Sequence, residues 1–190
     1  MGVKASLGIL GGVFDPPHLG HLALARAAID ELGLDRLLVL VVADPGHKVA
    51  DAPPAARLEL TRLAFADIPE AEVELDDHAR TVDSLEERKP ADAVFVVGGD
   101  ELAEFVTWKD PGRILDLVHL AVALRSGVPN ERVREALARV PAPDRISFFE
   151  MEPAPVSSSQ VRDRLSRNER IDDLVPALVA EEIARLGLYS

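Results

Sequence analysis

The chain contains no cysteine and no long apolar run. Without cysteine it cannot form disulfide bonds or a thiolate metal site, which excludes disulfide-stapled secreted domains and cysteine-based zinc modules. No apolar segment approaches the roughly 20 residues that a membrane-spanning helix needs. The short apolar stretch near the N-terminus is not followed by a signal-peptide cleavage pattern. We therefore expect a cytoplasmic protein without a membrane partner.

Positive charge is scarce in this chain. Lys and Arg number 21 against 33 Asp and Glu, which gives a formal net charge of −12. Binding of nucleic-acid backbones depends on contacts between phosphates and basic side chains, so we expect no nucleic-acid partner. An anionic protein that binds an anionic small molecule must gather its few cations at one site. The sequence leaves open whether the chain forms a homo-oligomer.

Apolar runs alternate with amphipathic segments, and 47% of the 190 residues are hydrophobic. The runs predict strands over Val3–Leu10, Leu37–Val42, Glu72–Leu75, Ala93–Val97, His119–Leu124 and Ile146–Phe149. The amphipathic segments predict helices over Leu19–Leu32, Pro54–Ala66, Asp83–Glu87, Pro111–Leu117, Asn130–Val140, Ser158–Leu165 and Val175–Leu186. Alternation of this kind favours a mostly parallel sheet with helices on both faces. We expect one domain over residues 1–190, an α/β fold of the Rossmann-like doubly wound class.

Two C-terminal helices close this predicted fold. Pro176 suits the first turn of the last helix, where a missing N–H group has little effect. Leu174, Leu178 and Ile183 are expected to seal that helix against the core. In doubly wound sheets the ligand lies outside the carboxyl ends of the strands, where the strand order reverses.

The most informative segment is Gly11-Gly12-Val13-Phe14-Asp15-Pro16-Pro17-His18-Leu19-Gly20-His21-Leu22, between the first predicted strand and helix. Glycines at such a turn let the backbone approach a ligand closely, and the N–H groups at the helix start favour an anion. His18 and His21 stand at i and i+3, so both rings can face one phosphate. Two alternatives remain open: a metal site that joins both histidines to Asp15, and ordinary surface or capping histidines.

The block Gly12–His21 resembles the G-[T/S]-F-D-P-x-H-x-G-H signature of the nucleotidyltransferase superfamily. Further motifs in the same order make nearly the whole chain similar to nicotinate-nucleotide adenylyltransferases. Gly46-His47-Lys48 resembles P-P-H-K, Thr81-Val82-Asp83-Ser84-Leu85 resembles T-x-D-T-L, Gly98-Gly99-Asp100 resembles G-x-D, Trp108 stands at the family tryptophan, Arg125-Ser126-Gly127 resembles R-x-G, Val156–Arg162 resembles I-S-S-T-x-I-R, and Leu174-Val175-Pro176 with Leu188-Tyr189 resembles the closing segment.

This resemblance implies an enzyme that moves AMP from ATP to nicotinate mononucleotide and releases pyrophosphate, a step of NAD biosynthesis. The acceptor's phosphate would attack the α-phosphorus of ATP directly, without a covalent intermediate, and Mg²⁺ would arrive with ATP. The catalytic residues would be His18, His21, Lys48 and Arg162. The histidines would donate to the α and β phosphates, and Lys48 would hold the acceptor's phosphate.

Further residues would bind the two substrates. Gly11, Gly12 and Phe14 would shape the first turn around the nucleotide. Ser157 and Ser158, at a helix start, would join Arg162 around the β and γ phosphates.

The remaining motif residues each have a functional and a structural interpretation. Gly98 and Asp100 would approach a nucleoside and accept from ribose hydroxyls, whereas Asp100 could instead cap a helix. Trp108 would stack on a flat ring, and a core tryptophan is the alternative. Thr81 would bind the pyridine nucleotide or cap the following helix. Arg125 would reach a phosphate or form a surface ion pair.

Three departures from the family pattern fall on the acceptor side. Val13 stands where the family usually has threonine or serine. Ala79-Arg80-Thr81 replaces S-Y-T in a shortened segment, and Asp44-Pro45-Gly46-His47 precedes Lys48 in place of the full proline pair. The acceptor therefore remains open: nicotinamide mononucleotide, phosphopantetheine or another phosphorylated metabolite are alternatives, as is a non-catalytic nucleotide-binding module.

Overall fold

The computed structural model describes residues 6–46, 49–124 and 129–189. Its strands are β1 (Leu7–Gly12), β2 (Arg36–Val42), β3 (Ala71–Asp76), β4 (Ala93–Gly98), β5 (His119–Leu124) and β6 (Ile146–Glu150). Its α-helices are α1 (Leu19–Leu32), α2 (Pro54–Phe65), α3 (Thr81–Arg88), α4 (Gly99–Phe105), α5 (Pro111–Leu117), α6 (Glu131–Leu137), α7 (Ser158–Ser166) and α8 (Ala177–Leu186). A short 3-10 helix, η1, covers Pro143–Arg145.

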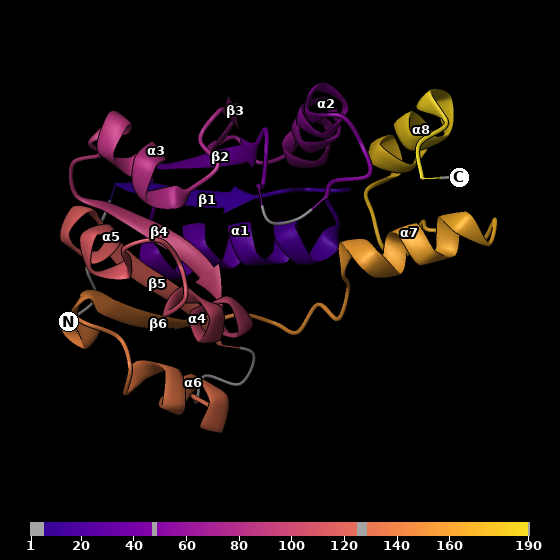
Figure 1. The fold of residues 1–190 in the computed structure, drawn as a ribbon. Helices are drawn as coiled ribbons and strands as arrows, with labels where there is room; N and C mark the ends of the chain where they lie inside the picture. The colour runs from indigo at the N-terminus through magenta and orange to yellow at the C-terminus, as the bar shows by residue number, and fades with distance from the viewer. Residues whose placement is uncertain (1–5, 47–48, 125–128, 190) are drawn as a thin grey trace.

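The six strands form one sheet in the order β3-β2-β1-β4-β5-β6, and every pairing is parallel. The chain builds outward from β1 to β3, then crosses to β4 and builds outward on the other side (Figure 1). The strand order therefore reverses between β1 and β4. The predicted doubly wound α/β fold is confirmed.

Alternate residues along the central strands face two separate cores, as the two-residue period of a strand requires. Leu10, Val39 and Val96 pack with side chains of α1, α2, α7 and α8. Their neighbours Ile9, Leu40 and Phe95 pack with side chains of α3, α4, α5 and α6. A strand with both faces covered must be apolar throughout, and this explains why β1, β2, β4 and β5 read as mainly apolar runs, whereas the edge strand β3 alternates with Glu72 and Glu74.

Most element predictions agree with the structure within one or two residues, but two do not. The predicted helix over Asn130–Val140 is shorter at both ends: Asn130 caps it from outside, with its side chain accepting from the Val133 N–H at 3.0 Å, and the helix ends at Leu137. Helix α4 was not predicted at all. Leu178 does not seal α8, since half of its surface is exposed and Val179 points inward instead.

Other expectations concern the two ends of the described chain. Leu174 and Ile183 are buried, as predicted. Pro176 stands at the cap position just before α8. The first residues of the strand predicted from Val3 lie outside the described residues. None of the helices in residues 6–46, 49–124 and 129–189 is both long and apolar enough to cross a membrane.

Candidate active site

A cavity of about 1070 Å³ opens at the carboxyl ends of the central strands. Gly11 and Gly12 at the end of β1 line it, together with Val42 of β2 and Asp76 of β3. Val97, near the end of β4, lines the other side. The cavity thus lies where the strand order reverses, which is where parallel α/β sheets bind ligands. This is the edge at which the sequence predicts a ligand.

The two motif histidines lie against each other at the start of α1. Their ring centroids are 3.7 Å apart and their planes differ by 27°. His18 is the N-cap residue: its Nδ1 accepts from the Gly20 N–H at 3.1 Å, and its own N–H donates to Nδ1 of His21 at 3.1 Å. The capping interpretation is therefore true of both rings. His21 lines the cavity, whereas His18 does not.

Burial keeps both imidazoles neutral. It lowers the pKa of His18 to about 4. Burial first, and the neighbouring His18 second, hold the pKa of His21 well below its ordinary value. Because Nδ1 accepts a hydrogen bond in each ring, the single proton of each neutral imidazole sits on Nε2. Near neutral pH both rings are therefore uncharged hydrogen-bond donors, and the positive charge of the site must come from arginine and lysine.

Packing around Phe14 holds His21 in place. Phe14 is 2% exposed, and its ring centroid lies 4.7 Å from that of His21 and 6.2 Å from that of Phe65. A side chain at Gly12 would place its Cβ atom 2.9 Å from the Phe14 ring, closer than carbon atoms can pack. Gly12 is thus required by the packing of the turn.

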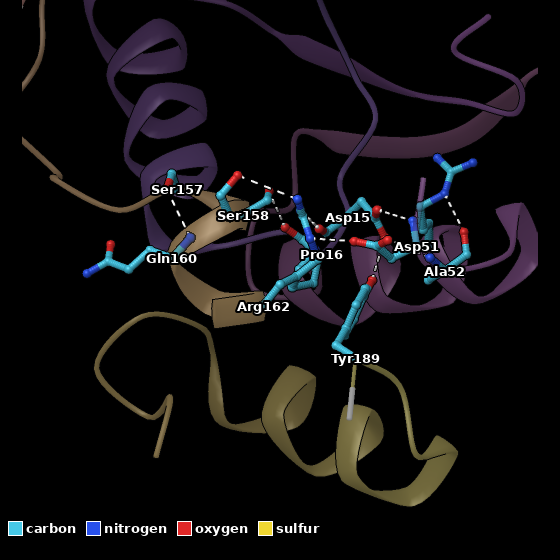
Figure 2. A network of polar contacts seen from close by, with 11 residues as sticks. Asp15, Pro16, Asp51, Ala52, Ser157, Ser158, Gln160, Arg162 and Tyr189 are labelled. Carbon is cyan, nitrogen blue, oxygen red and sulfur yellow. Dashed lines mark hydrogen bonds and ion pairs between the residues drawn. The ribbon is translucent and has the colours of Figure 1, made fainter. Parts of the chain in front are cut away.

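Arg162, on α7, reaches the cavity from a distant part of the sequence. Its Nη1 donates to the backbone carbonyl of Asp15 at 2.7 Å, and its Nε lies 2.6 Å from the Asp51 carboxylate. Its Nη2 lies 3.5 Å from Oγ of Ser159. Figure 2 shows that these acceptors come from separate segments of the chain. The guanidinium is held in place at the cavity wall before any ligand binds.

The two predicted serines begin α7, as the sequence indicates. Ser157 is the N-cap residue, and its Oγ accepts from the Gln160 N–H at 3.2 Å. Ser158 donates its hydroxyl to the backbone carbonyl of Pro16 at 2.9 Å (Figure 2). Ser158 lines the cavity and Ser157 does not. The Ser157 hydroxyl therefore caps α7, and the Ser158 hydroxyl joins the start of α7 to the turn after β1.

Arg57 is a buried residue that the sequence interpretation missed. It is 0% exposed, and its guanidinium donates to four backbone carbonyls, those of Ala52, Val13, Val42 and Ala43, at 2.7–3.1 Å. These carbonyls belong to the loops that follow β1 and β2. Arg57 thereby fixes two walls of the cavity. Its spacing to Leu60, Thr61 and Ala64 places it on the apolar stripe of α2, and that spacing was the available signal.

Asp15 collects donors from two further segments. Its side chain is buried and accepts from the N–H groups of Asp51 and Ala52 at 2.6 and 3.1 Å. The hydroxyl of Tyr189 donates to the same carboxylate at 2.8 Å. The metal interpretation of Asp15 finds no support here, because these protein donors already surround its oxygens. Within the described residues, no group of three or more His, Cys, Asp or Glu side chains could hold a metal ion.

The opposite end of the cavity is formed by α3 and the segment after α4. Thr81 is the first residue of α3 and Arg80 is its N-cap, without a side-chain capping bond, so the capping interpretation of Thr81 is wrong. Both residues line the cavity, as does Ser84 one turn later. The Ser84 Oγ is buried and has no hydrogen-bond partner.

Trp108 combines the two interpretations given for it. Its ring meets Phe105 and Phe95 at centroid distances of 5.4 and 6.1 Å, both edge-on, and it still lines the cavity. Next to it, the ammonium of Lys109 pairs with the Asp83 carboxylate at 2.7 Å. An aromatic face and two basic residues, Arg80 and Lys109, therefore lie at this end of the cavity.

A third histidine, which the sequence interpretation did not single out, lies in the same region. His78 lines the cavity, with Nδ1 2.9 Å from Asp76 and Nε2 3.1 Å from Glu87. The hydrogen bond to Asp76 is the main reason that the pKa of His78 is raised. His78 is thus the histidine of the cavity that gains a proton most readily.

The prediction for Gly98 and Asp100 needs correction. Gly98, not Asp100, is the N-cap of α4, and its N–H donates to the Glu101 carboxylate at 2.8 Å. Asp100 does not line the cavity, and its carboxylate lies 3.9 Å from Arg132. Glu101 and Glu104 line the cavity instead, because α4 begins directly after β4 and turns them toward it.

Two predicted residues, Lys48 and Arg125, lie outside the described residues. Of the remaining predicted site residues, eight line the one cavity: Gly11, Gly12, Phe14, His21, Thr81, Trp108, Ser158 and Arg162. These residues come from both ends and the middle of the chain. The fold therefore assembles most of the motifs into a single site.

The fold and this site define a nucleotidyltransferase: residues 9–164 match the Cytidylyltransferase-like family model, and the chain belongs to that family. A "probable nicotinate-nucleotide adenylyltransferase" of Thermomicrobium roseum is 39% identical over 96% of this chain and 91% of the relative. The protein of the same name from Bordetella petrii is also 39% identical, over 96% of this chain and 98% of its own length. Within the wider class, the chain belongs to the nicotinate-nucleotide adenylyltransferases, which confirms the resemblance seen in the motifs.

Solved structures agree with the fold. The structure of Plasmodium falciparum nicotinic acid mononucleotide adenylyltransferase complexed with APC superposes with a TM-score of 0.75. The match covers 97% of both chains at 15% sequence identity. At that identity the likeness extends to the architecture alone.

Proposed function

We propose that this protein transfers AMP from ATP to nicotinate mononucleotide and releases pyrophosphate. The observation that carries the proposal is the convergence of His21, Arg162 and the start of α7 on a cavity at the switch point of the sheet. The family to which the chain belongs supplies the reaction class. Arg162 at one end of the cavity supports binding of the triphosphate there, and Trp108 at the other end supports binding of a flat acceptor.

The reaction needs orientation and charge stabilisation more than it needs a protein nucleophile. An oxygen of the acceptor's phosphate forms a bond to the α-phosphorus of ATP while the bond to the bridging oxygen of pyrophosphate breaks. Negative charge moves onto the departing pyrophosphate. Holding the two reactants in line, with donors placed where charge accumulates, lowers the barrier to such a transfer.

The triphosphate would lie between α1 and α7. His21 donates from Nε2 to the transferring phosphate, and His18 keeps its partner ring aligned through the stack. Arg162 and Ser158 are placed to receive the β and γ phosphates. The exposed N–H groups at the start of α7 favour the same negative charge. Lys48 remains the predicted ligand of the acceptor's phosphate.

Mg²⁺ would enter with ATP and neutralise charge on its phosphates. The described residues offer no cluster of three or more His, Cys, Asp or Glu ligands for a resident ion. A cation whose ligands are mainly phosphate oxygens and water fits a site of this kind. The protein's own contribution is to hold the phosphates to which the ion binds.

The acceptor end suits a flat ring that carries a carboxylate. Trp108 offers an aromatic surface, while Arg80 and Thr81 lie at the start of α3. The Ser84 hydroxyl, buried without a partner, adds a donor one turn along the same helix. Cations and hydroxyls at a helix start favour an anionic group over a neutral amide. This arrangement supports nicotinate over nicotinamide, with the arginine replacing the family's aromatic residue.

The test is a pyrophosphate-release assay with purified protein, ATP, Mg²⁺ and a panel of phosphorylated acceptors. We expect release with nicotinate mononucleotide and at least tenfold slower release with nicotinamide mononucleotide, since one charged contact is on the order of 1.4 kcal/mol. Release with phosphopantetheine or nicotinamide mononucleotide alone would replace the proposed acceptor. Binding of ATP without release for any acceptor would identify a nucleotide-binding module instead.

A further inference from the structure

Tyr189 lies beside the predicted triphosphate site, although it follows α8 and is far from the other site residues in sequence. Its hydroxyl donates to Oδ1 of Asp15 at 2.8 Å (Figure 2). Burial first, and the hydrogen bond to Asp15 second, raise the pKa of Tyr189, so the phenol keeps its proton. Neither Leu188 nor Tyr189 lines the cavity, so a direct contact with the substrates does not explain this motif.

Asp15 connects that hydroxyl to Arg162 by two routes. Its backbone carbonyl accepts directly from Nη1 of Arg162 at 2.7 Å. Its carboxylate accepts the N–H groups of Asp51 and Ala52, and the Asp51 side chain lies 2.6 Å from Nε of Arg162. Through the Asp15 carboxylate, the turn after β1, the segment Asp51–Ala52 and Tyr189 are hydrogen-bonded to one another beside the Arg162 guanidinium.

We infer that Tyr189 is a positioning residue for ATP binding: through the Asp15 carboxylate it fixes the segment that holds the Arg162 guanidinium at the cavity wall. The inference rests on the proposed function only in assigning ATP to this cavity. Tyr189 does not line the cavity, so it acts on the nucleotide through its neighbours.

The physical basis is the entropy of the arginine side chain. A free arginine loses rotamer freedom when it binds a phosphate, and this loss weakens the interaction. Arg162 already has three acceptors, so less freedom remains to be lost. Its other N–H groups stay available for the nucleotide. Without the Tyr189 donor, the buried carboxylate of Asp15 loses one partner and the segment around it loosens.

The decisive measurement is calorimetric titration of ATP with Mg²⁺ into Tyr189→Phe in the absence of any acceptor. Phenylalanine keeps the ring and removes the hydroxyl alone. We expect ATP to bind about five- to tenfold more weakly, the scale of one lost hydrogen bond. Leu186→Ala, an exposed position on α8, is the matched control and should bind ATP as the parent does. Because no acceptor is present, a wrong acceptor assignment cannot produce this result.

A double-mutant cycle separates positioning from general destabilisation. If Tyr189 acts through Arg162, Tyr189→Phe should weaken ATP binding in the parent and leave it unchanged in an Arg162→Ala background. In steady-state assays of the single variant, KM for ATP should rise while kcat and the acceptor's KM stay within about twofold. Equal weakening in both backgrounds, or unchanged ATP binding in Tyr189→Phe, would overturn the inference.

Two variants at Asp51 test the second route without disturbing the core, because this side chain is 56% exposed. Asp51→Asn keeps an acceptor for Arg162 and should retain ATP affinity, whereas Asp51→Ala removes the acceptor and should weaken binding about threefold or more. Tighter ATP binding in Asp51→Ala would show that Asp51 competes with the triphosphate for Arg162. That outcome would contradict the positioning role.

Discussion

At the scale of single residues, the two histidines serve the fold and the site with different nitrogen atoms. Each Nδ1 accepts a backbone N–H at the start of α1, which leaves each Nε2 with the proton. A residue that only capped the helix would be replaceable by serine or aspartate. Imidazole differs from those residues in that it caps with one nitrogen and still donates with the other. Capping of the helix and donation to a phosphate are therefore compatible in these histidines.

Replacement of His21 by alanine tests its contribution to transfer. We expect kcat to fall about 100-fold or more, because a hydrogen-bond donor to the transferring phosphate is lost. His119→Ala is the control, since His119 begins β5 at the opposite end of the sheet. It should leave kcat within about twofold. An unchanged kcat in His21→Ala would remove this ring from the mechanism.

A substitution at Val13 tests whether the residues that differ from the family pattern affect acceptor binding. Val13 lines the cavity with an apolar side chain where family members usually have a hydroxyl. In Val13→Thr the new hydroxyl should lower the KM for nicotinate mononucleotide about three- to tenfold, the effect of one added hydrogen bond. Val13→Ala changes the volume without adding a donor and should give no such gain. Equal kinetics for all three proteins would exclude this position from acceptor binding.

At the scale of elements, α2 contributes the side chain that organises the loops around the site. Arg57 is held entirely within the protein and donates to carbonyls after β1 and after β2. Burial lowers its pKa, while the nearby Asp15 opposes that shift. One helix therefore supports two loops that line the cavity.

Substitution of Arg57 by methionine should destabilise the protein. The carbonyls that it serves would remain buried without donors, so we expect the free energy of unfolding to fall by about 3 kcal/mol or more. Urea denaturation measures the change. Arg62→Met, on the exposed face of the same helix, should stay within about 0.5 kcal/mol of the parent. A similar loss in both variants would mean that the carbonyl contacts of Arg57 contribute nothing specific.

Elements with a clear pattern were predictable from sequence, and those without one were not. Helix α1 has its predicted bounds because its apolar residues recur at helical spacing between a cap and Gly33. Helix α4 was missed because it begins at Gly99, a poor helix former, and has seven residues. As a consequence the sequence does not identify Glu101 and Glu104 as residues that line the cavity. Hydrophobic spacing in the sequence predicts helices and strands, but it does not predict which side chains of a short helix face a cavity.

At the scale of the whole molecule, the site depends on pairs that no local pattern reveals. The motifs predicted that His21 and Arg162 face one cavity, because each motif could be matched as a unit. The contacts of Asp15 with Asp51 and Tyr189 could not be predicted, since they depend on how the sheet order brings the segments together. The net charge of −12 makes the placement of Arg162 at the cavity important, because an anionic protein repels a nucleotide unless its cations lie at the binding site.

The neutral, buried state of His18 predicts acid sensitivity of the whole fold. The folded-state pKa lies below the ordinary value of about 6.5, so folding favours the neutral ring. The neutral His18 ring contributes roughly 3 kcal/mol to the free energy of unfolding. This contribution is complete above about pH 6.5 and is lost as the pH falls toward about 4. Urea denaturation across this range measures the loss. His18→Asn, which keeps a capping side chain without a titrating ring, should reduce the slope of the profile, with the contribution of His21 remaining, and an unchanged slope would contradict the assignment.

The bond between Asp15 and Tyr189 also has a consequence for biosynthesis. During translation the first strand and its glycine turn leave the ribosome long before residue 189 is made. Until then the Asp15 carboxylate lacks one of its donors, although all six strands of the sheet precede residue 151. A nascent chain of this protein therefore completes the hydrogen bonds around Asp15 only when Tyr189 has emerged from the exit tunnel.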